Sequence, residues 1–125
     1  MPWEHFEVSK TGICHVQRLS TGEVFDARYR LEFISTGKQR VYWGHQLVIE
    51  LPERPIVGRV KGGGGSYISE LKLCNAQLQD AGLRLLVAGN DSTYYVTGLS
   101  ESSGFGYIDG HKKAVHIMQR WPDHV

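Results

Sequence analysis

Hydrophobic and polar residues alternate through the first half of the chain, in the pattern of β-strands. The alternation is clearest between two Ser-Thr-Gly turns, at residues 20–22 and 35–37. The apolar positions between these turns are Phe25, Ala27, Tyr29, Leu31 and Phe33. A period of two is typical of a strand with one buried face. Because a second alternating run follows the second turn, we expect a three-stranded antiparallel meander over residues 12–19, 24–34 and 40–51.

A different spacing marks one helix, which follows a run of four glycines. Its apolar residues recur at intervals of three and four and are Ile68, Leu71, Cys74, Leu78 and Ala81. This period predicts an amphipathic helix over residues 66–82, with Ser66 as its N-cap and Gly82 at its end.

The glycine run Gly62–Gly65 lacks the spacing of phosphate-binding loops, although bare amides before a helix favour anions. We interpret it as a hinge, with an anion site and an engineered Gly-Gly-Gly-Gly-Ser linker as the alternatives. Pro52 and Pro55 end the meander because proline cannot donate to a central ladder. Residues 52–65 are therefore expected to form a connector, with or without a short strand at 56–60.

Short apolar runs after the helix predict further strands. They lie at residues 83–88, 93–97, 105–108 and 114–119. Strands on both sides of one helix, joined by short connections, indicate the α+β class. We expect a single domain, residues 1–125, in which the meander (12–51) and the C-terminal strands (83–119) form a mainly antiparallel sheet packed by the central helix.

Composition narrows the class of function. The 125 residues carry 14 basic and 13 acidic side chains, so the net charge is +1, and nucleic acid is an unlikely partner without a basic bias. No apolar run approaches the length of a membrane span, and the first residues do not form a signal peptide. We expect a cytoplasmic protein in which both cysteines, Cys14 and Cys74, are buried free thiols.

Catalytic and metal-binding patterns are missing from the sequence. Among six histidines, His111 and His116 are five residues apart, which matches no metal-ligand spacing, and His45 lies on the apolar side of its strand, as structural histidines do. Neither cysteine has an activating base on its own face, and no nucleophile elbow occurs. We expect no cofactor, no metal and no enzymatic activity. A further hypothesis is an enzyme that uses a histidine-assisted residue near His111 or His116. A cavity lined by these two side chains would support it.

An aromatic strand at Gly104-Phe105-Gly106-Tyr107-Ile108 resembles the centre of the RNA-recognition motif and of cold-shock domains. In those families strand aromatics stack on bases. Here Ser103 takes the place of the expected basic residue. The resemblance implies a module that binds single-stranded nucleic acid or a small ligand, which is the alternative function.

Four stretches of the C-terminal half carry a second resemblance. They are LRLLVAG at 83–89, GLS at 98–100, SGFGY at 103–107 and AVHIM at 114–118. In these stretches the chain resembles small immunity proteins of bacterial toxin systems, such as those of contact-dependent growth inhibition. The resemblance implies a non-catalytic inhibitor that neutralises a cognate toxin protein by tight stoichiometric binding. Because aromatic residues dominate interface energies, the expected partner-binding residues are Tyr94, Tyr95, Glu101, Phe105, Tyr107 and His111.

Overall fold

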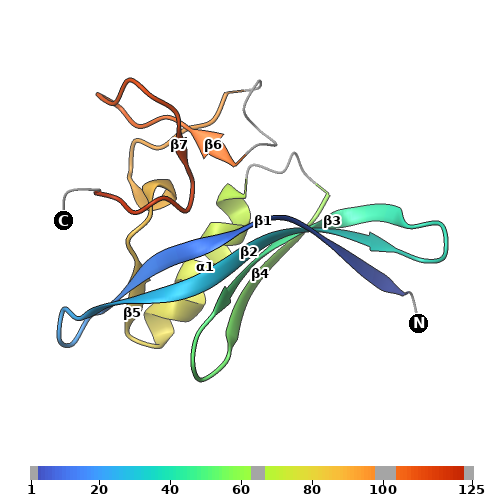
Figure 1. The fold of residues 1–125 in the computed structure, drawn as a ribbon, viewed down its shortest axis with the longest axis horizontal. Helices are drawn as coiled ribbons and strands as arrows, with labels where there is room; N and C mark the ends of the chain where they lie inside the picture. The colour runs from blue at the N-terminus through green and yellow to red at the C-terminus, as the bar shows by residue number, and fades with distance from the viewer. Residues whose placement is uncertain (1–2, 63–66, 98–103, 123–125) are drawn as a thin grey trace.

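The structure is a computed structural model that describes residues 3–62, 67–97 and 104–122. Its largest element is a curled antiparallel sheet of five strands in the order β4-β3-β2-β1-β5. The strands are β1 (Glu4–Arg18), β2 (Val24–Thr36), β3 (Val41–Glu50), β4 (Pro55–Lys61) and β5 (Leu83–Leu85). One helix, α1 (Ile68–Asp80), lies across one face of the sheet (Figure 1). The α+β class and the mainly antiparallel sheet are thus confirmed.

The main core lies between the sheet and α1, where alternate strand residues meet the apolar stripe of the helix. Its members include Ala27, Tyr29 and Leu31 of β2, Leu47 and Ile49 of β3, and Leu71, Cys74 and Leu78 of α1. Both cysteines are free and buried in this core, as expected. Burial raises the pKa of each thiol to about 12, so neither is a thiolate at neutral pH.

The ends of the helix differ from the expectation. The helix runs from Ile68 to Asp80, and its N-cap position is Tyr67, which has a left-handed backbone (φ 64°) and makes no side-chain cap. The predicted cap, Ser66, lies outside the described residues. Ala81 is exposed because the helix ends before it, whereas Glu70, predicted to lie off the buried stripe, is 1% exposed.

The sheet is larger than the expected three-stranded meander. β1 begins at Glu4, eight residues before the predicted strand at 12–19. Its first half forms an arm whose side chains stay exposed, so this part of the strand shows no burial pattern from which it could be predicted. The connector predicted at 52–65 contains β4, which pairs with β3 from Pro55 to Lys61. Figure 1 shows the start of β1 and the β2–β3 turn extending beyond the helix as this arm.

Two β-bulges mark the place where the arm leaves the helix-covered sheet. In β1, Val8 pairs with Glu32 and Lys10 with Leu31, so Ser9 is the extra residue. In β3, Gly44 pairs with Ile34 and Tyr42 with Ser35, so Trp43 is the extra residue. A bulge shifts the alternation by one, and Trp43 therefore does not continue the apolar face predicted for this strand.

The C-terminal half has less regular structure than its apolar runs predict. It contains β5, a 3₁₀ turn (η1, Ala88–Asn90) and a two-stranded sheet of β6 (Phe105–Gly106) and β7 (Val115–His116). The run at 93–97 forms one bridge, Tyr95 with Tyr107, instead of a strand. Glycine and polar residues interrupt these runs, so loops carry a second small core of Ala88, Ile108 and Val115. Among the described residues no helix has the length and apolarity needed to cross a membrane.

Candidate functional site

The predicted partner-binding residues come together in part, on the C-terminal half. Tyr95 and Tyr107 exchange two backbone hydrogen bonds of 2.9 and 2.8 Å, and their ring centroids are 5.6 Å apart. Tyr95 is 53% exposed. The backbone pairing places the half-buried Tyr107 beside the exposed Tyr95, and the contact between the rings restricts both side chains, so they present aromatic area at a low cost in side-chain entropy on binding.

Phe105 lies two residues from Tyr107 and is 37% exposed. The edge of its ring contacts His116 at a centroid distance of 5.2 Å, and the ammonium of Lys10 lies 5.5 Å from its ring centre. Lys10 belongs to β1, so this contact joins the aromatic face to the main sheet. We call Tyr95, Phe105 and Tyr107 the aromatic face.

The other predicted interface residues have different surroundings. Tyr94 packs against both cores, its hydroxyl is buried without a hydrogen-bond partner, and burial raises the pKa of its phenol to about 12. His111 contacts the edge of Trp121 at 5.1 Å. Glu101 lies outside the described residues. Tyr94 therefore supports the aromatic face from beneath, and His111 lies beside it on another loop.

A second group of side chains lies at the start of α1, where the two bulges meet the helix. The Tyr42 hydroxyl is 2.9 Å from Nδ1 of His45, and Nε2 of His45 is 3.1 Å from Oε2 of Glu70. His45 and Glu70 are each 2% exposed at the side chain, whereas Tyr42 is 50% exposed. We call these three residues the tyrosine–histidine–glutamate cluster.

Burial dominates the electrostatics of this cluster. An ionised carboxylate at such depth needs a partner, and His45 is its ion-pair partner among the described residues. The Glu70–His45 contact is not aligned as a hydrogen bond, since Oε2 of Glu70 receives no correctly directed donor. Burial raises the pKa of the Tyr42 phenol above its ordinary value, and the Glu70 charge adds to the rise, so Tyr42 keeps its proton at neutral pH.

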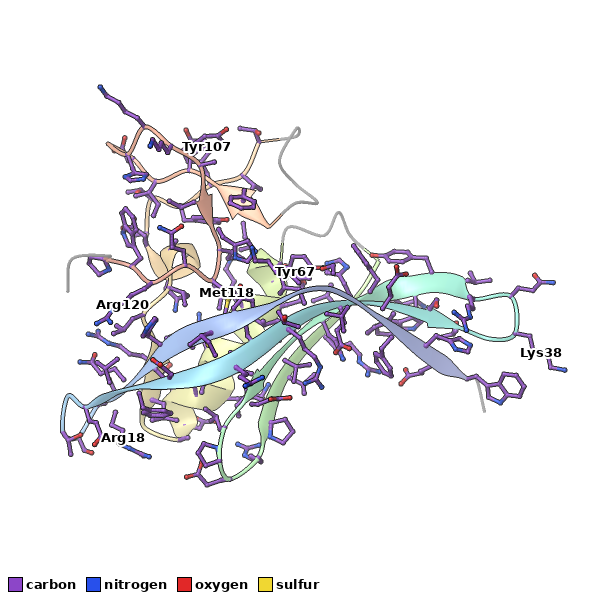
Figure 2. The ribbon with its side chains drawn as sticks, viewed as in Figure 1. Arg18, Lys38, Tyr67, Tyr107, Met118 and Arg120 are labelled. Atoms are coloured by element: carbon purple, nitrogen blue, oxygen red, sulfur yellow. The ribbon has the colours of Figure 1, made fainter. Side chains whose placement is uncertain are left out.

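Tyr67 and Ser9 complete the surroundings of the cluster. The Tyr67 ring contacts His45 edge-on at 5.1 Å, and its hydroxyl is 3.3 Å from that of Ser9, the extra residue of the β1 bulge. Figure 2 shows Tyr67 between α1 and the base of the arm, with Lys38 at the far tip of the arm and Tyr107 in the C-terminal half. A left-handed tyrosine, two bulges and a buried acid–base pair thus occur at one place, as they do at many functional sites.

The positions of the cavities and of possible metal ligands bear on the two remaining hypotheses for histidine, a catalytic site and a metal site. The cavities of about 530, 400 and 320 Å³ are lined by neither His111 nor His116. In the described part of the chain, no three histidine, cysteine or acidic side chains are grouped as a metal site requires. A histidine-assisted enzyme at His111 or His116 therefore gains no support from these cavities and stays a prediction.

Comparisons with models of protein families, with curated proteins and with solved structures gave no match. The candidate sites therefore have to be judged on their own geometry.

Sequence reasoning missed the tyrosine–histidine–glutamate cluster, although it placed His45 on the buried side of β3. The missing information was the bulge at Trp43, which turns Tyr42 to the same side as His45. A weaker signal was available in Glu70, an acidic residue that precedes a member of the apolar stripe in the first turn of the helix.

Proposed function

We propose that this chain is a non-catalytic, protein-binding inhibitor of the immunity type. It acts in the bacterial cytoplasm and neutralises a cognate toxin, as in contact-dependent growth inhibition, by tight stoichiometric binding. The observation that carries the proposal is the aromatic face, where the paired Tyr95 and Tyr107 lie with their rings in contact and Phe105 is two residues away.

The physical argument rests on aromatic area and charge. Tyrosine and phenylalanine rings bury much surface for few rotatable bonds, and interface hot spots are enriched in tyrosine. Lys10 over the Phe105 ring adds one cation at the margin of the face. With a net charge of +1, recognition depends on shape and local contacts more than on long-range attraction.

Co-purification with the product of the adjacent reading frame tests the proposal. We expect a one-to-one complex of nanomolar affinity, and the double variant Tyr95→Ala, Tyr107→Ala should weaken it by about 100-fold or more, because one hot-spot ring contributes about 2 kcal/mol. Trp3→Ala is the matched control, since Trp3 is an exposed aromatic next to Lys38 at the far end of the arm. A neighbouring protein that is not a toxin, or one that is not retained, would refute the immunity role.

The alternative, a module for single-stranded nucleic acid or a small ligand, uses the same strand and stays a prediction. Base stacking needs an open ring face, and Lys10 lies over the Phe105 ring while His116 contacts its edge. Oligonucleotide binding by the native chain that is lost in a Phe105→Ala, Tyr107→Ala variant would favour this alternative over the inhibitor.

A further inference from the structure

The tyrosine–histidine–glutamate cluster has the connectivity of a nucleophile, a base and an acid. Tyr42 contributes a half-exposed hydroxyl, His45 the imidazole that contacts it at 2.9 Å, and Glu70 the buried carboxylate on the other imidazole nitrogen at 3.1 Å. With the ring proton on Nε2, beside the carboxylate, Nδ1 has a free lone pair and accepts the phenol proton. This is the order in which an acid orients a base and the base activates a hydroxyl.

The position of Tyr42 is fixed from two sides. The bulge at Trp43 turns it toward His45, and its hydroxyl can also donate to the carbonyl oxygen of Gly62 at 3.3 Å, so the shorter contact with Nδ1 of His45 and this longer one compete for the same phenol proton. The same residue lines a cavity of about 320 Å³ under the arm, together with His5, Glu7, Phe33, Ser35 and Arg40. A small molecule in this cavity would therefore lie against a tyrosine whose hydroxyl is within hydrogen-bond distance of a histidine.

We propose that Tyr42 is a nucleophile that accepts an acyl group from a small activated ester, one whose leaving group is less basic than the Tyr42 phenolate, with His45 as its general base and Glu70 as the buried charge that stabilises the imidazolium of His45. The Tyr42 oxygen forms a bond to the ester carbonyl carbon as its proton moves to Nδ1 of His45. The ester C–O bond then breaks, and the departing aryloxide takes this proton from the imidazolium. The products are an acylated Tyr42 and a phenol less basic than tyrosine, and no oxidant or metal is needed.

The cavity favours an ester that carries a negative charge. Arg40 lines it, and no ion pair between described residues uses Arg40. A guanidinium pairs well with a carboxylate or phosphate at a distance from the reacting carbonyl. Arg40 would thereby hold the substrate, while Tyr42 attacks it.

Acylation of the full-length chain by 4-nitrophenyl acetate, followed by peptide mass spectrometry, tests the proposal with an internal reference. Tyr95 is 53% exposed and Tyr42 is 50% exposed, so the two residues have a similar overall exposure. General-base assistance should make Tyr42 react about 100-fold faster than Tyr95, and a ratio below about tenfold would overturn the proposal. This comparison uses the native chain alone and does not depend on the folding of any variant.

Single-residue variants then test the roles of His45, Glu70 and Arg40 in the acylation of Tyr42. His45→Gln and Glu70→Gln should each bring the rate at Tyr42 close to that at Tyr95, whereas His15→Gln, which changes a histidine that pairs with Asp26 and does not line the cavity, should leave it unchanged. Circular dichroism confirms that each variant is folded. Arg40→Gln should remove a preference for 4-nitrophenyl hemisuccinate over the uncharged acetate. A His45→Gln variant that is folded and still reacts at the native rate would assign the reactivity to exposure alone.

This proposal is independent of the inhibitor function, because the hydrogen bonds of the Tyr42 hydroxyl with described residues are to His45 and Gly62 and involve no member of the aromatic face. Loss of toxin binding in the Tyr95→Ala, Tyr107→Ala variant should leave acylation of Tyr42 unchanged. Conversely, Tyr42→Phe should abolish the acylation without weakening the complex.

Discussion

Gly58 is the residue at which the sheet and the helix come closest. A Cβ atom built there would collide with the carbonyl oxygen of Glu70, in the first turn of α1. Because the obstacle is backbone and not a flexible side chain, the strand and helix would have to move apart to admit it. The sequence offered no sign of this contact, since Gly58 stood in a segment interpreted as a connector.

We predict that Gly58→Ala lowers the free energy of unfolding by about 2–3 kcal/mol, the usual cost of overpacking, as measured by urea denaturation. Gly22→Ala is the control, because a Cβ at Gly22 meets nothing within 4 Å and the substitution costs only the strain of a positive φ, about 1 kcal/mol. Equal losses in the two variants would show that Gly58 does not mark a close approach.

At the scale of elements, α1 is stabilised by the few positions that face the sheet. Leu78 is fully buried, whereas Leu73, on the same helix, is 45% exposed. The two residues have the same propensity and the same chemistry, so a difference between them measures burial alone.

Leu78→Ala should therefore cost about 3 kcal/mol of stability, and Leu73→Ala less than about 1 kcal/mol, in denaturant unfolding experiments. If the two substitutions cost the same, the helix does not lie on the sheet as described.

The elements that the sequence predicted well are those in which one face is buried. β2 and α1 show clear periods because the core lies on one side of each, and their existence and type were predicted correctly. The first half of β1 was missed because the arm has no core on either side. The two bulges could not be predicted from the sequence either. One extra residue changes which side chains share a face of the strand, but it leaves the amino-acid composition of the strand almost unchanged. The aromatic pair Tyr95–Tyr107 was proposed from residue type, whereas Tyr42, His45 and Glu70 meet only through the fold.

At the scale of the whole molecule, His116 joins the C-terminal half to the main sheet. It is 5% exposed, stacks near Tyr29 of β2 at 6.1 Å and contacts Phe105. Its Nδ1 accepts a hydrogen bond from the backbone of Met118, so the neutral ring carries its proton on Nε2, which has no acceptor among the described residues. Burial, with a contribution from Lys10, lowers the pKa of His116 from 6.5 to about 4.

The sign of the resulting pH dependence follows from the proton count. Between pH 6.5 and about 4 the unfolded chain holds a proton on His116 that the folded chain does not, so stability falls as pH falls through this window. The loss should total about 3 kcal/mol and level off below the folded pKa. Thermal unfolding across pH 4–7 measures it. A His116→Asn variant, whose amide oxygen can replace Nδ1 as acceptor, should show a flatter profile, and an unchanged slope would contradict the assignment.

The bulge at Ser9 has a consequence for the molecule in a crowded solution. Within the described residues, the outer edge of β1 pairs with β5 only at Val16, Gln17 and Arg18, so the arm presents free backbone groups to other chains. Open edges of this kind recruit identical strands and start fibrous aggregates. The extra residue breaks the regular spacing of those groups, and Lys10 follows it at once with a charge. The irregularity that directs the Ser9 hydroxyl toward Tyr67 thus also protects the protein from stacking on copies of itself.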